Sequence, residues 1–137
     1  MRGIAGNSRT AGAATALALA AATFVIPLAA AQPAAAASEC KGRIDFAKSR
    51  NYYAIMSSDD GDTREAARYN DATVKEIGHA LPACRNAHHR ERVRDLLKKS
   101  EDYAERALDA NRRKDRRQGR EYEEVVKARL EEALYRA

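Results

Sequence analysis

Apolar side chains recur every three or four positions along most of the chain after residue 42, a spacing that predicts α-helices rather than strands. One run occupies residues 42–57, a second extends from Thr63 to the region of Pro82, and two more follow between residues 87 and 135. An amphipathic helix buries its apolar face only by packing on another element. We therefore predict an all-α fold, a small up-and-down bundle of about four helices that form two antiparallel hairpins.

The residues expected to face the core are the members of each periodic run. The first run contains Ile44, Ala47, Tyr52, Ile55 and Met56, the second Ala66, Tyr69, Thr73, Ile77 and Leu81, the third Val93, Leu96, Leu97, Ser100, Tyr103, Ala104, Ala107 and Leu108, and the fourth Tyr122, Val125, Val126, Arg129, Ala133 and Leu134. The third run is the most regular of the four.

Turn-forming residues mark the ends of the predicted helices. Residues 57–62 are serine, aspartate and glycine, and Asp62 stands three positions before Glu65, as in a capping box that opens the second helix. Pro82 is expected to end this helix nearby, and Asn86 to cap the third one.

The third and fourth runs are separated by a stretch of polar and glycine residues, 111–120. We predict a turn near Gly119. The alternative is a single helix over residues 87–135, which would be about 75 Å long and would leave its apolar stripe uncovered.

The N-terminal region has the pattern of a secretory signal peptide. Arg2 and Arg9 precede an uncharged, largely apolar stretch that extends from Thr10 to Ser38. We predict that residues 1–37 form a cleavable signal peptide and that residues 38–137 form the mature helical domain. The expected location is the periplasm or the extracellular space.

Two alternatives concern the fate of this leader. Small residues also permit cleavage after Ala31 instead of Ala37. An uncleaved leader would be long enough to anchor the chain in a membrane, but two prolines and many alanines make this stretch a poor anchor. We expect cleavage, with no membrane span in the mature chain.

Cys40 and Cys84 are the only cysteines. An exported chain enters an oxidising compartment, where an even pair of cysteines is normally bridged. Cys40 begins the first predicted helix and Cys84 follows the second, so an antiparallel hairpin brings them to the same end. We predict a Cys40–Cys84 disulfide.

Metal binding is the main alternative use of these residues. Cys40, Cys84, His79 and His88 have the residue types of a tetrahedral zinc site, but thiols in an oxidising compartment are expected to form the disulfide first. Separately, Glu76 and His79 form a Glu-x-x-His pair, without the second pair that a di-iron bundle requires. We expect no metal and no cofactor, and retain metal binding by His79, His88 and His89 as an alternative function.

A basic segment, residues 112–120, carries six positive charges and one acid. Arg112, Arg113, Arg116 and Arg117 are its candidate binding residues, for another protein or for an anionic surface. The segment contains no aromatic residue that would stack on a base, so sequence-specific nucleic-acid binding is not expected. The alternative interpretation is a solvated turn between helices.

Tyr52 and Tyr53 are further candidate binding residues. Neighbouring positions on a helix lie about 100° apart, so one ring is expected to face the core and the other to be exposed. An exposed tyrosine can anchor a partner protein through its ring.

No catalytic motif is present: the chain has no Gly-x-Ser-x-Gly, no His-Glu-x-x-His and no phosphate-binding glycine loop. We therefore expect an exported, non-enzymatic interaction protein that binds another macromolecule. A small hydrolase with a pair of carboxylates is the remaining alternative.

Overall fold

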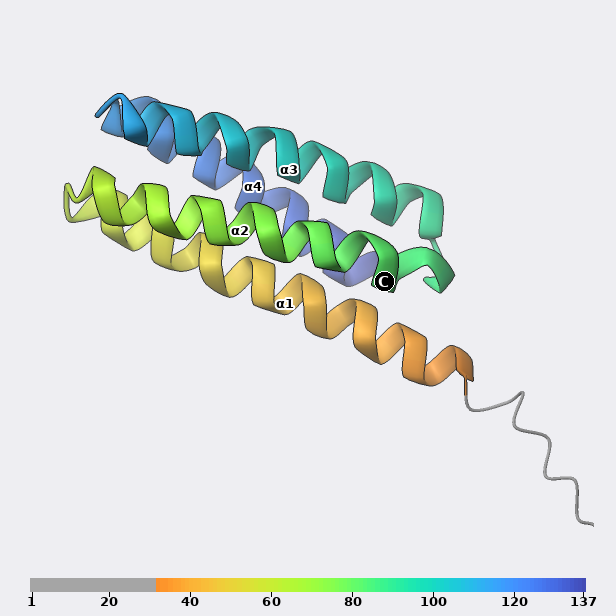
Figure 1. The fold of residues 1–137 in the computed structure, drawn as a ribbon. Coiled ribbons are helices and arrows are strands. Elements are labelled where there is room, and N and C mark those ends of the chain that lie inside the picture. Colours follow the sequence, from red (N-terminus) through yellow and green to blue (C-terminus); the bar gives the residue numbers. More distant parts are fainter. Residues whose placement is uncertain (1–31) are drawn as a thin grey trace, which may run out of the picture.

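A computed structural model describes residues 32–137 as four α-helices (Figure 1). They are α1 (Gln32–Asp59), α2 (Thr63–Ala83), α3 (Arg90–Arg112) and α4 (Arg116–Arg136), with a short 3-10 turn, η2 (Cys84–Asn86), after α2. Residues 1–31 of the predicted leader lie outside the described residues. The expected cleavage point after Ala37 falls near the start of α1.

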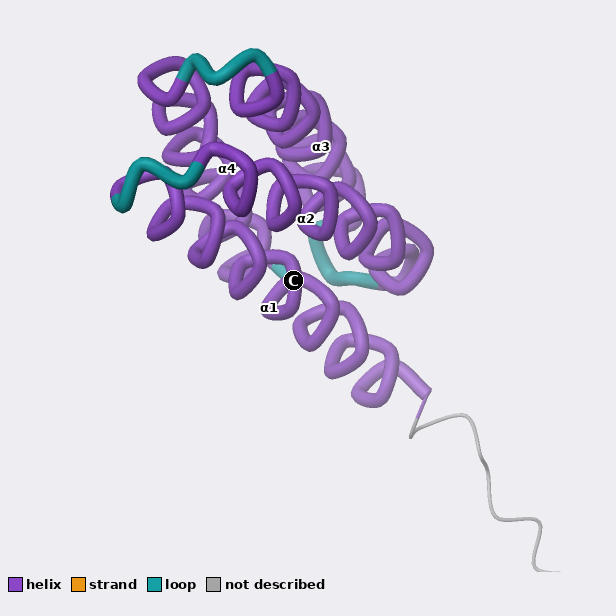
Figure 2. The backbone as a smooth tube through the Cα atoms, turned by 60° about the vertical axis from the view of Figure 1, so that its left-hand side comes forward, coloured by secondary structure: helices purple, strands orange, loops and turns teal. Residues whose placement is uncertain are grey.

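The helices form an up-and-down bundle, as predicted. Each helix packs on the next one in the chain, and α1 also packs on α4, so that the four helices enclose one core. The α1–α2 and α3–α4 turns lie at one end of the bundle, and the α2–α3 connection lies at the other (Figures 1 and 2). We call these the two-turn end and the disulfide end. None of α1 to α4 is long and apolar enough to cross a bilayer.

The core combines a few large aliphatic side chains with many alanines. The largest apolar side chains that are fully buried are Ile44, Ile77, Leu96, Leu97 and Leu130. The predicted stripe of α3 is confirmed, with Tyr103 and Leu108 only half-buried. In α4, Val126 and Ala133 are buried as predicted, whereas the other four predicted members are only half-buried.

The predicted core face of α1 is correct in part. Ile44, Ala47 and Ile55 are buried, whereas Tyr52 and Met56 are exposed. Their expected places are taken by small or polar residues, Asn51, Ala54 and Ser58, which are buried. The apolar pattern indicated the wrong face here because polar side chains occupy core positions in the second half of α1.

The Cys40–Cys84 disulfide is present at the disulfide end. The two sulfur atoms are 2.06 Å apart and the two Cα atoms 4.6 Å apart, and both residues are buried. The bond joins α1 to the residue that follows α2, as the antiparallel hairpin requires. The zinc alternative loses its two thiolate ligands in this arrangement.

The start and end of α2 follow the sequence prediction. The main-chain N–H of Glu65 donates to the Asp62 carboxylate at 2.9 Å, and the helix ends one residue after Pro82. The third helix differs from its prediction. Asn86 lies in η2, and α3 begins at Arg90 after His89.

The chain reverses at residues 113–115 instead of near Gly119, and two helices form instead of one long helix. Lys114 has a φ of +63°, in the left-handed region, and the Asp115 carboxylate accepts a hydrogen bond from the Gln118 N–H at 3.1 Å. The turn therefore uses a lysine in the conformation that favours glycine, followed by a capping aspartate. Gly119 lies within α4 and is buried.

Reduction of the disulfide is expected to lower the free energy of unfolding by about 4 kcal/mol, because the bond closes a loop with a sequence separation of 44 residues. Urea denaturation followed by circular dichroism, with and without a reducing agent, measures this change. The matched control is Cys40→Ala/Cys84→Ala, which should have the stability of the reduced protein and no response to the reductant. Equal stability of the oxidised and reduced proteins would contradict the prediction.

Candidate functional site

The four arginines predicted to bind a partner lie around the α3–α4 turn at the two-turn end. Arg112 is the last residue of α3, Arg113 lies in the turn, and Arg116 and Arg117 open α4. All four side chains are exposed, and none forms an ion pair with an acid within residues 32–137. Their charges are therefore available to a ligand.

Arg120, in the same basic segment, has a structural role. Its guanidinium donates to Asp59 at 2.7 Å and is also paired with Glu124, so it ties α4 to the end of α1. The hydrogen bond from Arg120 lowers the pKa of Asp59 and raises the pKa of Arg120. The basic segment thus divides into one paired arginine and several unpaired cations.

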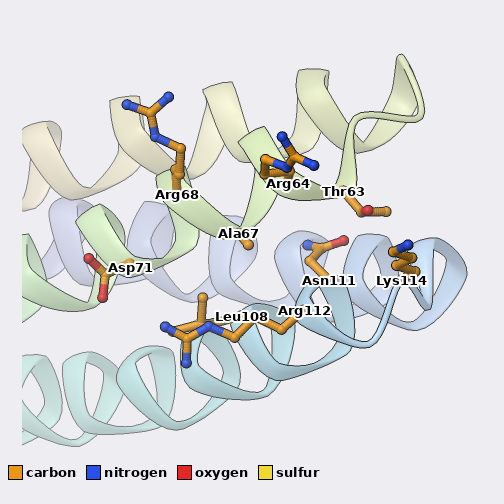
Figure 3. Close-up of a pocket in the computed structure, with 9 residues that line it drawn as sticks. All are labelled: Thr63, Arg64, Ala67, Arg68, Asp71, Leu108, Asn111, Arg112 and Lys114. Carbon is orange, nitrogen blue, oxygen red and sulfur yellow. The ribbon is translucent and has the colours of Figure 1, made fainter.

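A groove of about 450 Å³ lies between α2 and α3 at the two-turn end (Figure 3). Arg112 and Lys114 line one side, and Arg64 and Arg68 of α2 line the other. The two pairs are far apart in the chain, and only the fold brings them to one groove.

Tyr52 and Tyr53 are both exposed, so the prediction that one of them faces the core is wrong. Their exposed fractions are 56% and 45%, and Phe46 and Met56 on the same helix are exposed by 58% and 44%. The core side of α1 passes through Asn51, Ala54 and Ser58 instead, which leaves both rings outside it.

These four side chains form a surface that we call the α1 apolar face (Phe46, Tyr52, Tyr53 and Met56). Phe46 and Tyr53 are two helical turns apart, and Met56 is one turn from both tyrosines, so the four residues share one side of α1. Tyr53 stacks on Tyr69 of α2 with a ring separation of 5.3 Å, and Tyr52 lies 5.9 Å from Tyr53. The face therefore continues onto α2.

The histidines do not gather at one place. His79 lies 3.7 Å from Glu76, one turn earlier on α2, as the Glu-x-x-His spacing predicts. His88 and His89 contact each other after η2, with ring centroids 4.6 Å apart. In the described part of the chain, no three histidine, cysteine, aspartate or glutamate side chains form a group that could hold a metal ion.

A buried polar cluster, absent from the predictions, lies in the two-turn half of the bundle. Its centre is Glu123 of α4, a fully buried carboxylate. The Glu123 Oε1 atom accepts hydrogen bonds from Ser58 Oγ at 3.0 Å, Asn70 Nδ2 at 2.9 Å and Asn111 Nδ2 at 2.8 Å. Asn51 Nδ2 donates to the main-chain oxygen of Glu123 at 3.0 Å. We call these five residues the Glu123 cluster, and it joins all four helices.

The cluster contains more acceptors than donors. Glu123 Oε2 and the Oδ1 atoms of Asn51, Asn70 and Asn111 are buried and have no hydrogen-bond partner among the described residues. Burial raises the pKa of Glu123, although the hydrogen bonds from Asn70, Ser58 and Asn111 and the charge of Arg120 act in the opposite direction. Protonation of Oε2 would supply a donor where the cluster lacks one.

The surroundings of Glu123 differ from those of the two facing acids that the hydrolase alternative requires. Its carboxylate is bonded to amide and hydroxyl groups, and within residues 32–137 no other charged side chain is buried. This arrangement is that of a polar core and not of a pair of catalytic carboxylates.

No family model, curated protein or solved structure matches this chain.

The substitution Glu123→Gln is expected to stabilise the protein by about 1 kcal/mol at neutral pH. Glutamine keeps an oxygen for the three donors and adds an NH2 group that can donate to an unpartnered asparagine oxygen. The raised pKa means that wild-type stability falls as pH rises from the unfolded-state pKa through the folded-state pKa. The advantage of the variant should therefore grow with pH, and urea denaturation at acidic and neutral pH measures it.

The contrasting variant is Glu123→Leu, which leaves three buried donors without an acceptor and should lose about 3 kcal/mol or more. A loss of stability in Glu123→Gln at neutral pH, equal to that of the leucine variant, would show that the negative charge itself is required and would contradict the prediction.

The substitution Gly119→Ala is expected to destabilise the bundle by about 1–3 kcal/mol. A Cβ at this position would lie 2.6 Å from Asn111 Oδ1 and 2.8 Å from Asn111 Cγ, and Asn111 is held by Glu123. The matched control is Gly78→Ala, another helical glycine, with nothing within 4 Å of the new Cβ. The control should gain about 0.5–1 kcal/mol, and similar thermal melting changes in the two variants would refute this account.

Proposed function

We propose that this chain is an exported, non-enzymatic interaction protein that binds another macromolecule through the α1 apolar face. The observation that carries the proposal is the exposure of four large apolar side chains on one side of one helix. Contiguous apolar patches larger than roughly a few hundred Å² are uncommon on the surfaces of monomeric proteins and often mark interaction sites.

The residue types on this face favour a protein partner. Tyrosine and phenylalanine bring a large contact area with few rotatable bonds, and aromatic residues are enriched at the centres of protein interfaces. Phe46, Tyr53 and Met56 follow the helical spacing of a segment that fits an apolar groove on a partner. The tyrosine hydroxyls remain able to form hydrogen bonds at the edge of such an interface.

Two features of the chain support an exported location. The N-terminal sequence has the charge and apolar pattern of a signal peptide. The Cys40–Cys84 disulfide is a bond that persists in oxidising compartments. The partner is therefore expected to be another periplasmic or extracellular molecule.

The proposal is tested with the variant Phe46→Ser/Tyr52→Ser/Tyr53→Ser. Tagged wild-type and variant proteins are recovered from the exported fraction of their host after chemical crosslinking, and the crosslinked species are quantified by mass spectrometry. We expect one dominant partner whose yield falls at least about tenfold in the variant, because anchor residues dominate binding energy. Because the three side chains are exposed, the circular dichroism spectrum of the variant should show the same helix content as that of the wild-type protein.

The matched control carries three exposed serines on another helix, Lys98→Ser/Lys99→Ser/Asp102→Ser in α3. It should retain the partner. Recovery of the same partner in equal yield from all three proteins would assign the interaction to another surface.

A further inference from the structure

The groove between α2 and α3 is a second surface, separate from the α1 apolar face, and its charge is strongly one-sided. Arg64, Arg112 and Lys114 line it, and none of the three forms an ion pair with an acid in the described chain. Arg68 is paired with Glu65 at 2.9 Å. Asp71, an acid of the groove, is already paired with Lys75 at 2.6 Å.

The unpaired cations therefore determine the potential inside the groove. A recess lined by charges of one sign concentrates ligands of the opposite sign, because its protein walls screen the charges less than open solvent does. The groove favours an anionic ligand, and arginine in particular forms paired hydrogen bonds with carboxylates.

The cations are spread along both walls and do not converge on one point. Figure 3 shows Arg64 and Lys114 near the turn end of the groove and Arg112 further along it on α3, whereas the guanidinium of Arg68 points away from α3. A single small anion would contact only part of this set. A row of anionic groups along an extended segment would contact the three unpaired cations, Arg64, Arg112 and Lys114, together.

The uncharged residues that line the groove give further information on the kind of ligand it can bind. Ala67 and Leu108 are half-buried and line the groove between the cations, so the groove offers an apolar contact as well as charge. None of the lining residues is aromatic, and single-stranded nucleic acids are usually held by stacking on aromatic rings. A lipid headgroup layer presents a broad anionic surface, whereas these cations lie along a recess.

We propose that the α2–α3 groove binds an acidic segment of a partner protein in which a leucine-like side chain is flanked by carboxylates. The carboxylates pair with Arg64 and Arg112, with Lys114 beside them, and the apolar side chain rests on Leu108 and Ala67. This site is independent of the α1 apolar face.

The test uses a fluorescein-labelled peptide, Glu-Glu-Leu-Glu-Glu, and its uncharged counterpart, Gln-Gln-Leu-Gln-Gln, with fluorescence anisotropy as the readout. We expect saturable binding of the acidic peptide to the wild-type protein, and no saturable binding of the glutamine peptide. The variant Arg64→Glu/Arg112→Glu should bind the acidic peptide at least about tenfold more weakly.

The matched control is Arg94→Glu/Lys98→Glu, which makes the same charge change on α3 outside the groove. Both residues are exposed, and neither forms an ion pair with an acid within residues 32–137. It should stay within about twofold of wild type, since screened charges at a distance act weakly. The variant Phe46→Ser/Tyr52→Ser/Tyr53→Ser should also bind the peptide normally, which separates this test from that of the proposed function.

Four outcomes would overturn the proposal. The first is the absence of saturable binding of the acidic peptide. The second is equal weakening of binding by the groove and control variants, which would assign binding to net charge. The third is weakening only by a further variant, Arg113→Glu/Arg117→Glu, which would assign binding to the α3–α4 turn. The fourth is tighter, Arg64-dependent binding of oligothymidylate or of phosphatidylglycerol vesicles, which would assign the groove to nucleic acid or lipid.

Discussion

The two-turn half of the bundle depends on the hydrogen bonds that the carboxylate of Glu123 accepts. It accepts hydrogen bonds from Ser58, Asn70 and Asn111, which belong to three different helices. Much of the surrounding core is alanine, whose packing is close but weakly directional. Hydrogen bonds to a single buried oxygen restrict how each helix can slide or rotate. The cluster thus fixes the positions of the four helices along one another, which the alanine-rich core specifies poorly.

The two ends of the bundle are held together by different means. At the disulfide end, a covalent bond ties α1 to the end of α2. At the other end, the Glu123 cluster and the Arg120–Asp59 pair connect α4 to α1. Asn111 belongs both to the cluster and to the lining of the α2–α3 groove. The polar core therefore also fixes one wall of the proposed binding groove.

The sequence was sufficient for the fold class, the disulfide, the cap at Asp62 and the core face of α3. Each has a local signal: periodic apolar residues, an even cysteine pair, or a capping residue at a fixed spacing. It was insufficient where polar residues enter the core. Asn51 and Glu123 look like surface residues in a chain rich in charge, and only the packing of four helices shows them buried.

The turn at residues 113–115 was misplaced for a related reason. Glycine is the usual residue at positive φ, yet Lys114 adopts that conformation and Gly119 is needed for its small size beside Asn111. Only one wall of the groove could be predicted from the sequence. Arg112 belongs to a conspicuous basic segment, whereas Arg64 and Arg68 of α2 stand among residues of mixed charge. An even number of antiparallel helices brings the start of α1 and the end of α4 to the same end of the bundle (Figure 1). A domain fused at Ala137 would therefore extend from the disulfide end, at the opposite end of the bundle from the groove.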